Sequence, residues 1–250
     1  MYNTLVRITY DGTAYSGFQF QANAPSIQEA LEMALAVIYK QPVRVVGAGR
    51  TDSGVHARGQ GANFKAPFHI AADKLPYALN ALLPPDIVVI SAKKVPDSFH
   101  ARFDARRKLY SYTIDRADYP QVLRRLYSFH LPDPLDLGLI RKAARLFAGT
   151  HDFNFFQAAG SSVSDTIRKL FRVDVADYPA DDLLVFYIEG SGFLYHMVRL
   201  ITGTLIRVGK NTLALPEIEA ALEGLNSGAA GPTVPPHGLC LEKVYYDSDD

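Results

Sequence analysis

The sequence predicts an α+β protein with two halves. Residues 2–10 alternate between two faces, as a half-buried strand does, and a capped helix and a second strand follow. Later in the chain, two strand-like segments joined by a short turn precede a long helical pattern. The two groups of elements meet near residues 100–110. We therefore divide the chain into an N-terminal half, residues 1–104, and a C-terminal half, residues 105–250.

The N-terminal half contains the clearest helix of the sequence. Ser26 stands at an N-cap position and Glu29 three residues later, which is the capping-box pattern. The helix then carries one apolar stripe, formed by Ile27, Leu31, Ala34, Leu35 and Ile38. The other elements predicted for this half are strands at 43–46 and 87–90, an extended run from Ala62 and a helix-like segment at 72–83.

The C-terminal half is predicted to begin with an alternating strand in which Tyr110 and Tyr112 share a face. Two tyrosines in a strand are also what a plain sheet core contains. The elements predicted after it are a helix at 139–147, paired strands at 167–175 and 183–189, a long helix that opens at 190–192 and stops at Gly209, and a short helix at 216–222.

The long helix near the C-terminus shows two different faces. Its core stripe is Phe193, Met197, Ile201, Leu205 and Val208. A separate face carries Gly192, His196, Arg199 and Gly203. Because small residues stand at both ends of this face, Arg199 is predicted to reach toward a cleft instead of the core. His196 is interpreted as a structural residue.

Composition narrows the class of protein. The chain has 250 residues, 48% of them hydrophobic, which is typical of a globular protein. We find no apolar stretch long enough to span a bilayer and no signal-peptide pattern after Met1, so we expect a cytoplasmic protein. A single cysteine, Cys240, excludes an internal disulfide, and the seven histidines lack close metal-ligand spacing. We therefore expect no metal.

Charge distribution favours a nucleic-acid partner more than the net charge does. The formal net charge is zero, which argues mildly against nucleic-acid binding. Residues 99–125, however, hold seven basic and three acidic side chains, and we interpret Arg106 and Arg107 in this segment as RNA contacts. The acidic tail at 247–250 is predicted to hold compensating charge away from the basic segment.

Residues 47–64, GAGRTDSGVHARGQGANF, form the most informative stretch. Asp52 is predicted to lie on a loop that follows a strand, with Arg50 and Arg58 placing cations near its carboxylate. The glycines of the stretch are interpreted as giving backbone freedom and close approach to a ligand.

Two readings of this stretch are unfavourable. As a dinucleotide-binding fingerprint it fails, because Asp52 stands where the third glycine belongs. As the Asp-Ser-Gly motif of an aspartic protease, residues 52–54 would need a homodimer, because the chain has only one copy of the motif. Two such carboxylates share one proton, whereas a nearby Arg50 favours ionising both.

GRTDSGVHARGQ, at 49–60, resembles the signature of the tRNA pseudouridine synthase A family. Other stretches resemble family motifs in the same order. These are the loop at 10–21, with Phe18 in place of the usual tryptophan, the basic segment followed by Tyr110-Ser111-Tyr112, FLYHMVR at 193–199, and the stretch at 235–241, with Pro235 where alanine is more usual.

The resemblance implies the pseudouridine synthase fold, a mixed, mostly antiparallel sheet built from two ferredoxin-like halves with a central active-site cleft. It implies a homodimer that isomerises uridine to pseudouridine at positions 38, 39 and 40 of the tRNA anticodon arm without a cofactor. The motif matches also imply a role for each site residue. Asp52 is the nucleophile, and Arg199 pairs with it. Arg50 displaces the target base, Tyr110 stacks on the uracil, and Leu239 presses on the base.

A non-catalytic RNA-binding module is the alternative that the sequence leaves open. Such a module needs stacking aromatics and a basic loop but no carboxylate near a phosphate backbone, so Asp52 and Arg199 together argue against it. A carboxylate in a partly dry pocket needs a cation partner from elsewhere in the chain, and Arg199 is the candidate. Whether Asp52 attacks C1′ or C6, or assists a glycal-like route, is left open.

Overall fold

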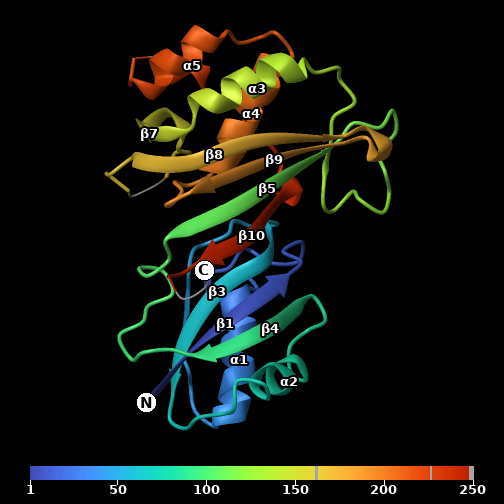
Figure 1. Cartoon of the computed structure of the whole chain (residues 1–250). Coiled ribbons are helices and arrows are strands. Elements are labelled where there is room, and N and C mark those ends of the chain that lie inside the picture. Colours follow the sequence, from blue (N-terminus) through green and yellow to red (C-terminus); the bar gives the residue numbers. More distant parts are fainter. Residues whose placement is uncertain (161–162, 226, 248–250) are drawn as a thin grey trace. The chain divides into compact units, whose positions relative to one another are not determined.

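The structure, a computed structural model, describes residues 1–160, 163–225 and 227–247. The chain forms two α+β units (Figure 1), one made of Met1–Arg106 with Cys240–Asp250 and the other of Arg107–Leu239. The last strand of the chain thus belongs mostly to the first unit. The predicted division of the sequence into two consecutive halves misses the return of this strand to the first unit, because the return depends on contacts between distant residues.

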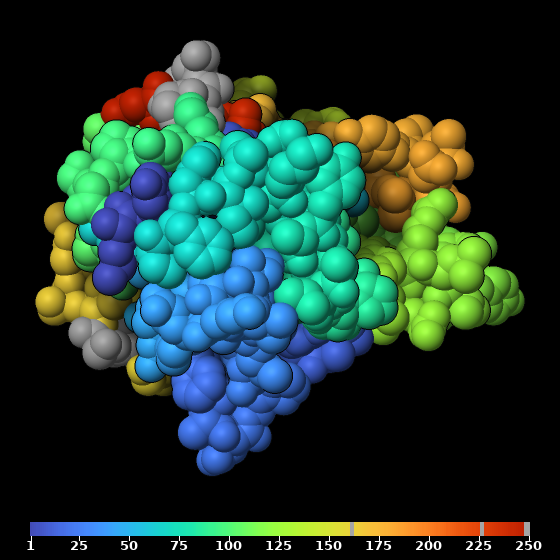
Figure 2. Space-filling model, turned by 90° about the horizontal axis from the view of Figure 1, so that it is seen from below, coloured from blue at the N-terminus to red at the C-terminus, as the bar shows by residue number. Residues whose placement is uncertain are grey.

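The first unit has the order of elements and strands of a ferredoxin-like fold. Its elements are β1 (Tyr2–Tyr10), α1 (Ile27–Tyr39), β2 (Val45–Gly47), β3 (His56–Ala66), α2 (Leu75–Asn80), β4 (Ile87–Lys94) and most of β10 (Leu239–Tyr245). β4, β1, β3 and β2 are neighbours in that order and all pair antiparallel. β10 pairs parallel with the start of β3, at Cys240 and Leu241. Figure 2 looks onto the surface of this unit that includes α1 and α2.

The capped helix of the first unit is confirmed. The Ser26 side chain accepts a hydrogen bond from the Glu29 amide at 3.2 Å, and Lys40, in a left-handed conformation, ends the helix. The prediction that β1 is buried on one face only is wrong, because Asn3 and Leu5 are as buried as Val6. The segment that follows β4 covers this second face of the strand.

The strand after the Asp52 loop begins at His56 and not near residue 62. Gly59 and Gly61 therefore lie within β3, where a Cβ at Gly59 would overlap the backbone of Glu242 and a Cβ at Gly61 would overlap the Tyr246 ring. These two glycines permit the close packing of the C-terminal segment against β3. The expectation that they serve close approach to a ligand is wrong.

The second unit repeats much of the same arrangement. Its elements are β5 (Arg107–Asp115), β6 (Phe129–His130), α3 (Leu137–Leu146), β7 (Gly149–Asp152), β8 (Ile167–Tyr178), β9 (Leu183–Gly190), α4 (Met197–Gly209) and α5 (Leu215–Leu222), with short 3-10 turns at Asn154–Phe156, Pro179–Asp181, Ser227–Ala229 and Pro236–Gly238. β5, β9, β8 and β7 are neighbours in that order and pair antiparallel. Figure 1 shows α3, α4 and α5 on one face of these strands.

The long helix of this unit begins later than the sequence pattern indicates. α4 starts at Met197, and His196 before it has a left-handed backbone with φ of 59°. Gly192 and Phe193 therefore precede the helix, and Phe193 is not part of its core stripe. Glycines at 190 and 192 disfavour helix by roughly 1 kcal/mol each, which explains the late start.

A pair of buried asparagines fixes the segment that follows β4. Asn3 on β1 is 2% exposed and Asn63 on β3 is 4% exposed. The Asn3 amide donates to the carbonyl oxygens of Pro96 and Phe99, both at 2.9 Å, and the Asn63 amide donates to Asn3 Oδ1 at 2.9 Å. Asn63 Oδ1 accepts from the Ala101 amide at 2.8 Å. Because both amides are bonded, their burial anchors this segment instead of destabilising the core.

We expect Asn63→Ala to lower the free energy of unfolding by about 2 kcal/mol or more, because it leaves buried polar groups of Asn3 and Ala101 without partners. Urea denaturation followed by fluorescence or circular dichroism measures the change. Gln41→Ala, at an exposed position, is the control and should change stability by less than about 0.5 kcal/mol. Equal stability of the two variants would contradict the anchoring role.

Candidate active site

Asp52 lies, as predicted, on the loop between β2 and β3, and its side chain is half-buried. The loop is held from the side by residues 11–18, which follow β1. The Phe18 amide donates to the Thr51 carbonyl oxygen at 3.1 Å, and the Gly54 amide donates to the Tyr15 carbonyl oxygen at 3.2 Å. The two loops therefore fix each other through their main chains on both sides of Asp52.

Two glycines make this close packing possible. A Cβ at Gly12 would overlap the carbonyl oxygen of Val55, and a Cβ at Gly17 would overlap that of Thr51. Gly17 also has a φ of 96°, which disfavours other residues. The first motif of the sequence is thus a support for the Asp52 loop.

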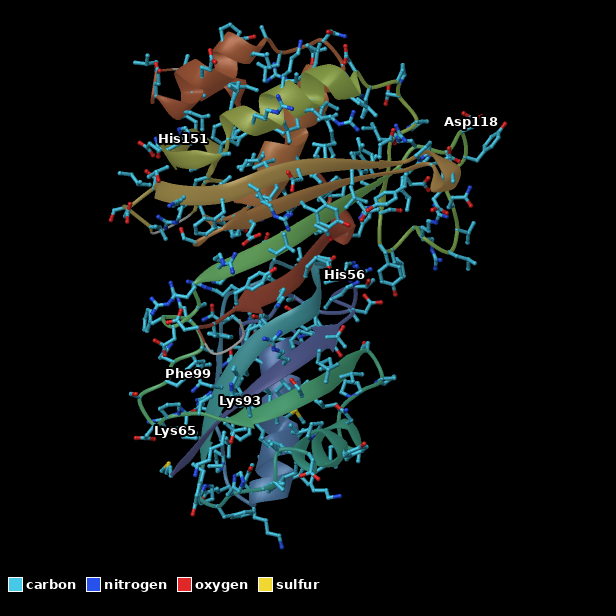
Figure 3. The ribbon with its side chains drawn as sticks, in the orientation of Figure 1. His56, Lys65, Lys93, Phe99, Asp118 and His151 are labelled. Carbon is cyan, nitrogen blue, oxygen red and sulfur yellow. The ribbon has the colours of Figure 1, made fainter. Side chains whose placement is uncertain are left out.

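His56 and Asp11 join the same two loops, and the sequence analysis did not single them out. His56, at the start of β3 (Figure 3), is 6% exposed. Its Nδ1 accepts from the Gly12 amide at 3.1 Å and lies 3.1 Å from Asp11 Oδ1. The signal was present, since Asp11 belongs to the first motif and His56 to the stretch around Asp52, but nothing local in the sequence shows that they meet.

The base of the Asp52 loop is bonded to the buried end of the sheet. The Tyr10 hydroxyl and Thr51 Oγ1 share a hydrogen bond of 2.8 Å, and the Gln60 amide donates to the Gly49 carbonyl oxygen at 2.8 Å. Burial raises the pKa of Tyr10, so its hydroxyl keeps its proton near neutral pH. Phe18, only 2% exposed, packs its ring against Gly47, so an apolar ring here fills the space without needing an indole N–H.

The two arginines predicted near Asp52 lie in different settings. Arg50 is exposed and stands within the Asp52 loop. Arg58 lies on β3 and pairs with Glu242 on β10 at 3.0 Å. The charge of Arg58 is therefore shared with an acidic partner in the same unit.

In the second unit, Tyr110 and Tyr112 lie on β5 opposite Ile188 and Phe186. Tyr110 is 7% exposed, and its ring meets that of Phe193 edge-on with centroids 5.0 Å apart. Tyr112 is fully buried and donates its hydroxyl hydrogen to the Pro235 carbonyl oxygen at 2.8 Å. Burial raises the pKa of Tyr112 despite the opposing charge of Arg199. Of the two, Tyr112 has the structural role.

A strap formed by residues 231–239 covers the face of α4 that carries Arg199. Arg199 Nε donates to the Val234 carbonyl oxygen at 2.7 Å. A Cβ at Gly203 would overlap the Pro232 carbonyl oxygen, and the Gly231 amide donates to Thr204 Oγ1 at 2.7 Å. Arg199 does lie off the core stripe, but Gly203 is small because the strap crosses it, and not because the face opens to a cleft.

The same strap ends at Leu239, which is 5% exposed. Gly238 lies directly against the Tyr112 ring, where a Cβ would be 2.7 Å from the nearest ring carbon. The hydrogen bond from Tyr112 to Pro235 anchors the other end of this segment. Leu239 and Arg199 are thus held by one element that rests on Tyr112.

The predicted basic segment is largely compensated by acidic residues from elsewhere. Arg106 pairs with Asp247 at 2.7 Å, and Arg107 pairs at 3.0 Å with Glu189, which Arg172 also contacts at 3.0 Å. The expectation that the acidic tail lies away from the basic segment is wrong for Asp247. The other tail residues, 248–250, lie outside the described part of the chain.

Within residues 1–160, 163–225 and 227–247, no group of three His, Cys, Asp or Glu side chains is arranged to hold a metal ion. Over the same ranges, no helix has the length and apolarity needed to cross a membrane. Burial raises the pKa of the Cys240 thiol to about 12, so the thiolate form is scarce near neutral pH.

Comparison with known proteins identifies the family. A family model described as "tRNA pseudouridine synthase" matches residues 7–104 and 143–247. The chain belongs to the tRNA pseudouridine synthase family. Members of this family are isomerases that convert uridine to pseudouridine in tRNA, and the α+β units described above are those of the pseudouridine synthase fold.

Individual relatives match this family member along almost their entire length. The tRNA pseudouridine synthase A of Thermoanaerobacter sp. (strain X514) is 45% identical over 246 residues, which cover 98% of this chain and 100% of the relative. The proteins of the same name from Bacillus licheniformis and Bacillus subtilis (strain 168) are 46% and 45% identical over 243 residues, or 96% of this chain and 98% of each relative.

A solved structure of the archaeal box H/ACA sRNP Nop10–Cbf5 complex aligns with 92% of this chain and 60% of that chain, at 11% identity and a TM-score of 0.38. A likeness at this level carries no argument about the site, which rests on the family match and on the geometry above.

We expect Gly17→Ala to reduce turnover by at least tenfold, because the new Cβ displaces the Thr51 carbonyl and with it the Asp52 loop. Turnover is measured as tritium release from tRNA labelled at uracil C5. Gly224→Ala is a matched control, because Gly224 also has a positive φ, of 80°, but a Cβ added there would meet no atom within 4 Å. Equal losses of turnover in the two variants would mean that backbone strain at the glycine causes the effect, and not displacement of the Thr51 carbonyl.

Proposed function

We propose that this chain is an enzyme that isomerises uridine to pseudouridine at positions 38, 39 and 40 of the tRNA anticodon stem-loop. The observation that carries the proposal is the half-buried Asp52, held by two interlocked loops within a family match that spans nearly the whole chain. The relatives named tRNA pseudouridine synthase A support the choice of substrate.

The reaction exchanges one bond to the ribose for another. The N1–C1′ bond breaks, the detached uracil turns, and a C5–C1′ bond forms while C5 loses a proton and N1 gains one. No electrons are gained or lost overall, so the chain's own acids and bases suffice. Asp52 acts as the nucleophile, and the main-chain bonds around it keep its carboxylate in place during the turn of the base.

Arg199 is proposed as the cation that keeps Asp52 ionised. Its Nε donates to the Val234 carbonyl oxygen, which fixes the plane of the guanidinium. A planar, oriented guanidinium suits a carboxylate better than a flexible ammonium does. The position of Arg199 in the stretch 193–199, which resembles a family motif, supports the assignment.

The remaining site residues are proposed to hold the RNA. Tyr110 stacks on the target uracil and Leu239 presses on it, whereas Arg50, exposed on the Asp52 loop, displaces the base from the RNA stack. The side chains proposed to contact the tRNA backbone are Arg58, Arg106 and Arg107. We further propose that the enzyme acts in the cytoplasm as a homodimer.

We expect Asp52→Asn to abolish turnover and to preserve the fold, because the amide is nearly isosteric but is a far weaker nucleophile than the carboxylate. Tritium release from C5-labelled tRNA should fall to background, while tRNA affinity stays within about tenfold of the parent. Asp73→Asn, which removes an exposed carboxylate of the same unit, should keep full activity. Residual turnover above roughly 1% of the parent rate, a loss under about 2.7 kcal/mol, would assign the chemistry to another group.

We expect Arg199→Lys to lower turnover at least tenfold, or about 1.4 kcal/mol of transition-state stabilisation, because lysine keeps the charge but loses the planar fork. Arg207→Lys on the same helix is the matched control, since Arg207 also donates to main-chain carbonyl oxygens, those of Gly228 and Thr212. The pairing proposal fails if both variants turn over tRNA like the parent.

A further inference from the structure

The segment between β4 and β5 carries a group of three side chains, of which Arg102 and Phe103 are exposed and His100 is half-buried. Phe103 is 72% exposed. Its ring stacks on that of His100, with centroids 4.2 Å apart and planes inclined by 28°. The Arg102 guanidinium carbon lies 5.8 Å from the centroid of the Phe103 ring. We call His100, Arg102 and Phe103 the tip stack.

The tip stack is rigidly built. The Phe103 amide donates to the His100 carbonyl oxygen at 3.1 Å, and the Arg102 amide donates to His100 Nδ1 at 3.2 Å. Asp104 closes the turn, since its Oδ2 accepts from the His100 amide at 2.8 Å. The exposure of Phe103 is therefore set by an ordered turn.

The root of the turn is anchored in the sheet. Ala101, next to His100, donates its amide hydrogen to Asn63 at 2.8 Å, and its carbonyl oxygen accepts from the Tyr246 hydroxyl at 2.9 Å. Both side chains that hold it are buried. Phe99, labelled in Figure 3, packs its ring against Tyr246 with centroids 5.2 Å apart. Anchoring of this kind keeps an exposed aromatic ring available to a ligand at low entropic cost.

Two lysines lie on the face of the sheet that is covered by the segment carrying the tip stack. Leu5 pairs with both Asn63 and Lys93, and Asn3 pairs with Lys65, so these side chains share the face that the anchored segment covers. Lys65 and Lys93 are exposed, and both are labelled in Figure 3. Lys65 also bonds Asp97 at 2.9 Å, which lowers the pKa of that carboxyl. A flat ring with the Arg102 guanidinium beside it suits the binding of a base and its phosphate.

We propose that the tip stack binds an unpaired nucleotide of the tRNA substrate, with the base on the exposed face of Phe103 and the phosphate near Arg102. The inference rests on the proposed function and adds a binding site to it. Base–aromatic stacking accepts any base, because each has a π-face. A purely apolar protein partner would not require the arginine and histidine that accompany the ring.

This site is separate from the catalytic loop. Asn63, which anchors the tip, lies seven residues along β3 from His56, which supports the Asp52 loop. At about 3.3 Å per residue the two ends are roughly 20 Å apart along the strand. The tip stack therefore affects the binding of tRNA and leaves the chemical step unchanged.

The test compares four variants of the full chain with the parent. Phe103→Ala and Phe103→Leu remove the ring, and the leucine keeps apolar bulk, whereas Phe103→Tyr keeps the ring. Tyr77→Ala is the matched control, because Tyr77 is 78% exposed and lies on α2 of the same unit. Affinity for unmodified tRNA is measured by filter binding, and KM and kcat by tritium release from C5-labelled tRNA.

We expect Phe103→Ala and Phe103→Leu each to weaken tRNA binding at least fivefold and to raise KM in step, with kcat unchanged. Phe103→Tyr and Tyr77→Ala should bind like the parent. The inference is overturned if Phe103→Leu keeps full affinity, if kcat falls instead of KM rising, or if sedimentation shows that Phe103→Ala changes only the oligomeric state. Failure of the parent itself to release tritium would instead refute the proposed function.

Discussion

The Asp52 loop depends on main-chain contact between residues 11–18 and 51–55. Hydrogen bonds from Phe18 and Gly54 join the two loops, and Gly12 and Gly17 allow their backbones to approach within a distance that any Cβ would prevent. Asp52 projects from the middle of this contact. A carboxylate that is only half-buried keeps access to substrate, so its geometry must come from the backbone and not from enclosing side chains.

In the second unit, a strap of main chain holds the side chain of Arg199 in position. Residues 231–239 cross α4 at Gly203, hold Arg199 through Val234 and rest on Tyr112 through Gly238. In both units, glycine marks the point at which one main chain lies against another, and this point is close in sequence to Asp52 in the contacted loop and to Arg199 on α4. Tyr112, two residues from Tyr110 on β5, anchors this strap and so has a structural role.

Local signals in the sequence were sufficient for the capped helix α1, the strand β1 and the loop position of Asp52. They failed where distant segments decide the structure. Phe193, which the sequence pattern places in the core stripe of α4, precedes the helix and packs on Tyr110. Gly59 and Gly61 of β3 pack against a C-terminal segment almost 200 residues away. The contact between His56 and Asp11 is of the same kind, because no spacing rule relates residues 45 positions apart.

Ion pairing separates the arginines of residues 99–125 that are proposed to contact RNA into exchangeable and committed ones. Arg106 and its partner Asp247 have side chains that are 62% and 73% exposed, so exchanging the carboxylate for a phosphate costs little. Arg107 bonds Glu189, whose side chain is 7% exposed, and withdrawing it would weaken the compensation of a buried charge. With 26 basic and 26 acidic residues in the chain, the proposed phosphate contacts depend on a few exchangeable cations, and the proposed stacking on exposed rings would supply the part of the affinity that salt does not screen.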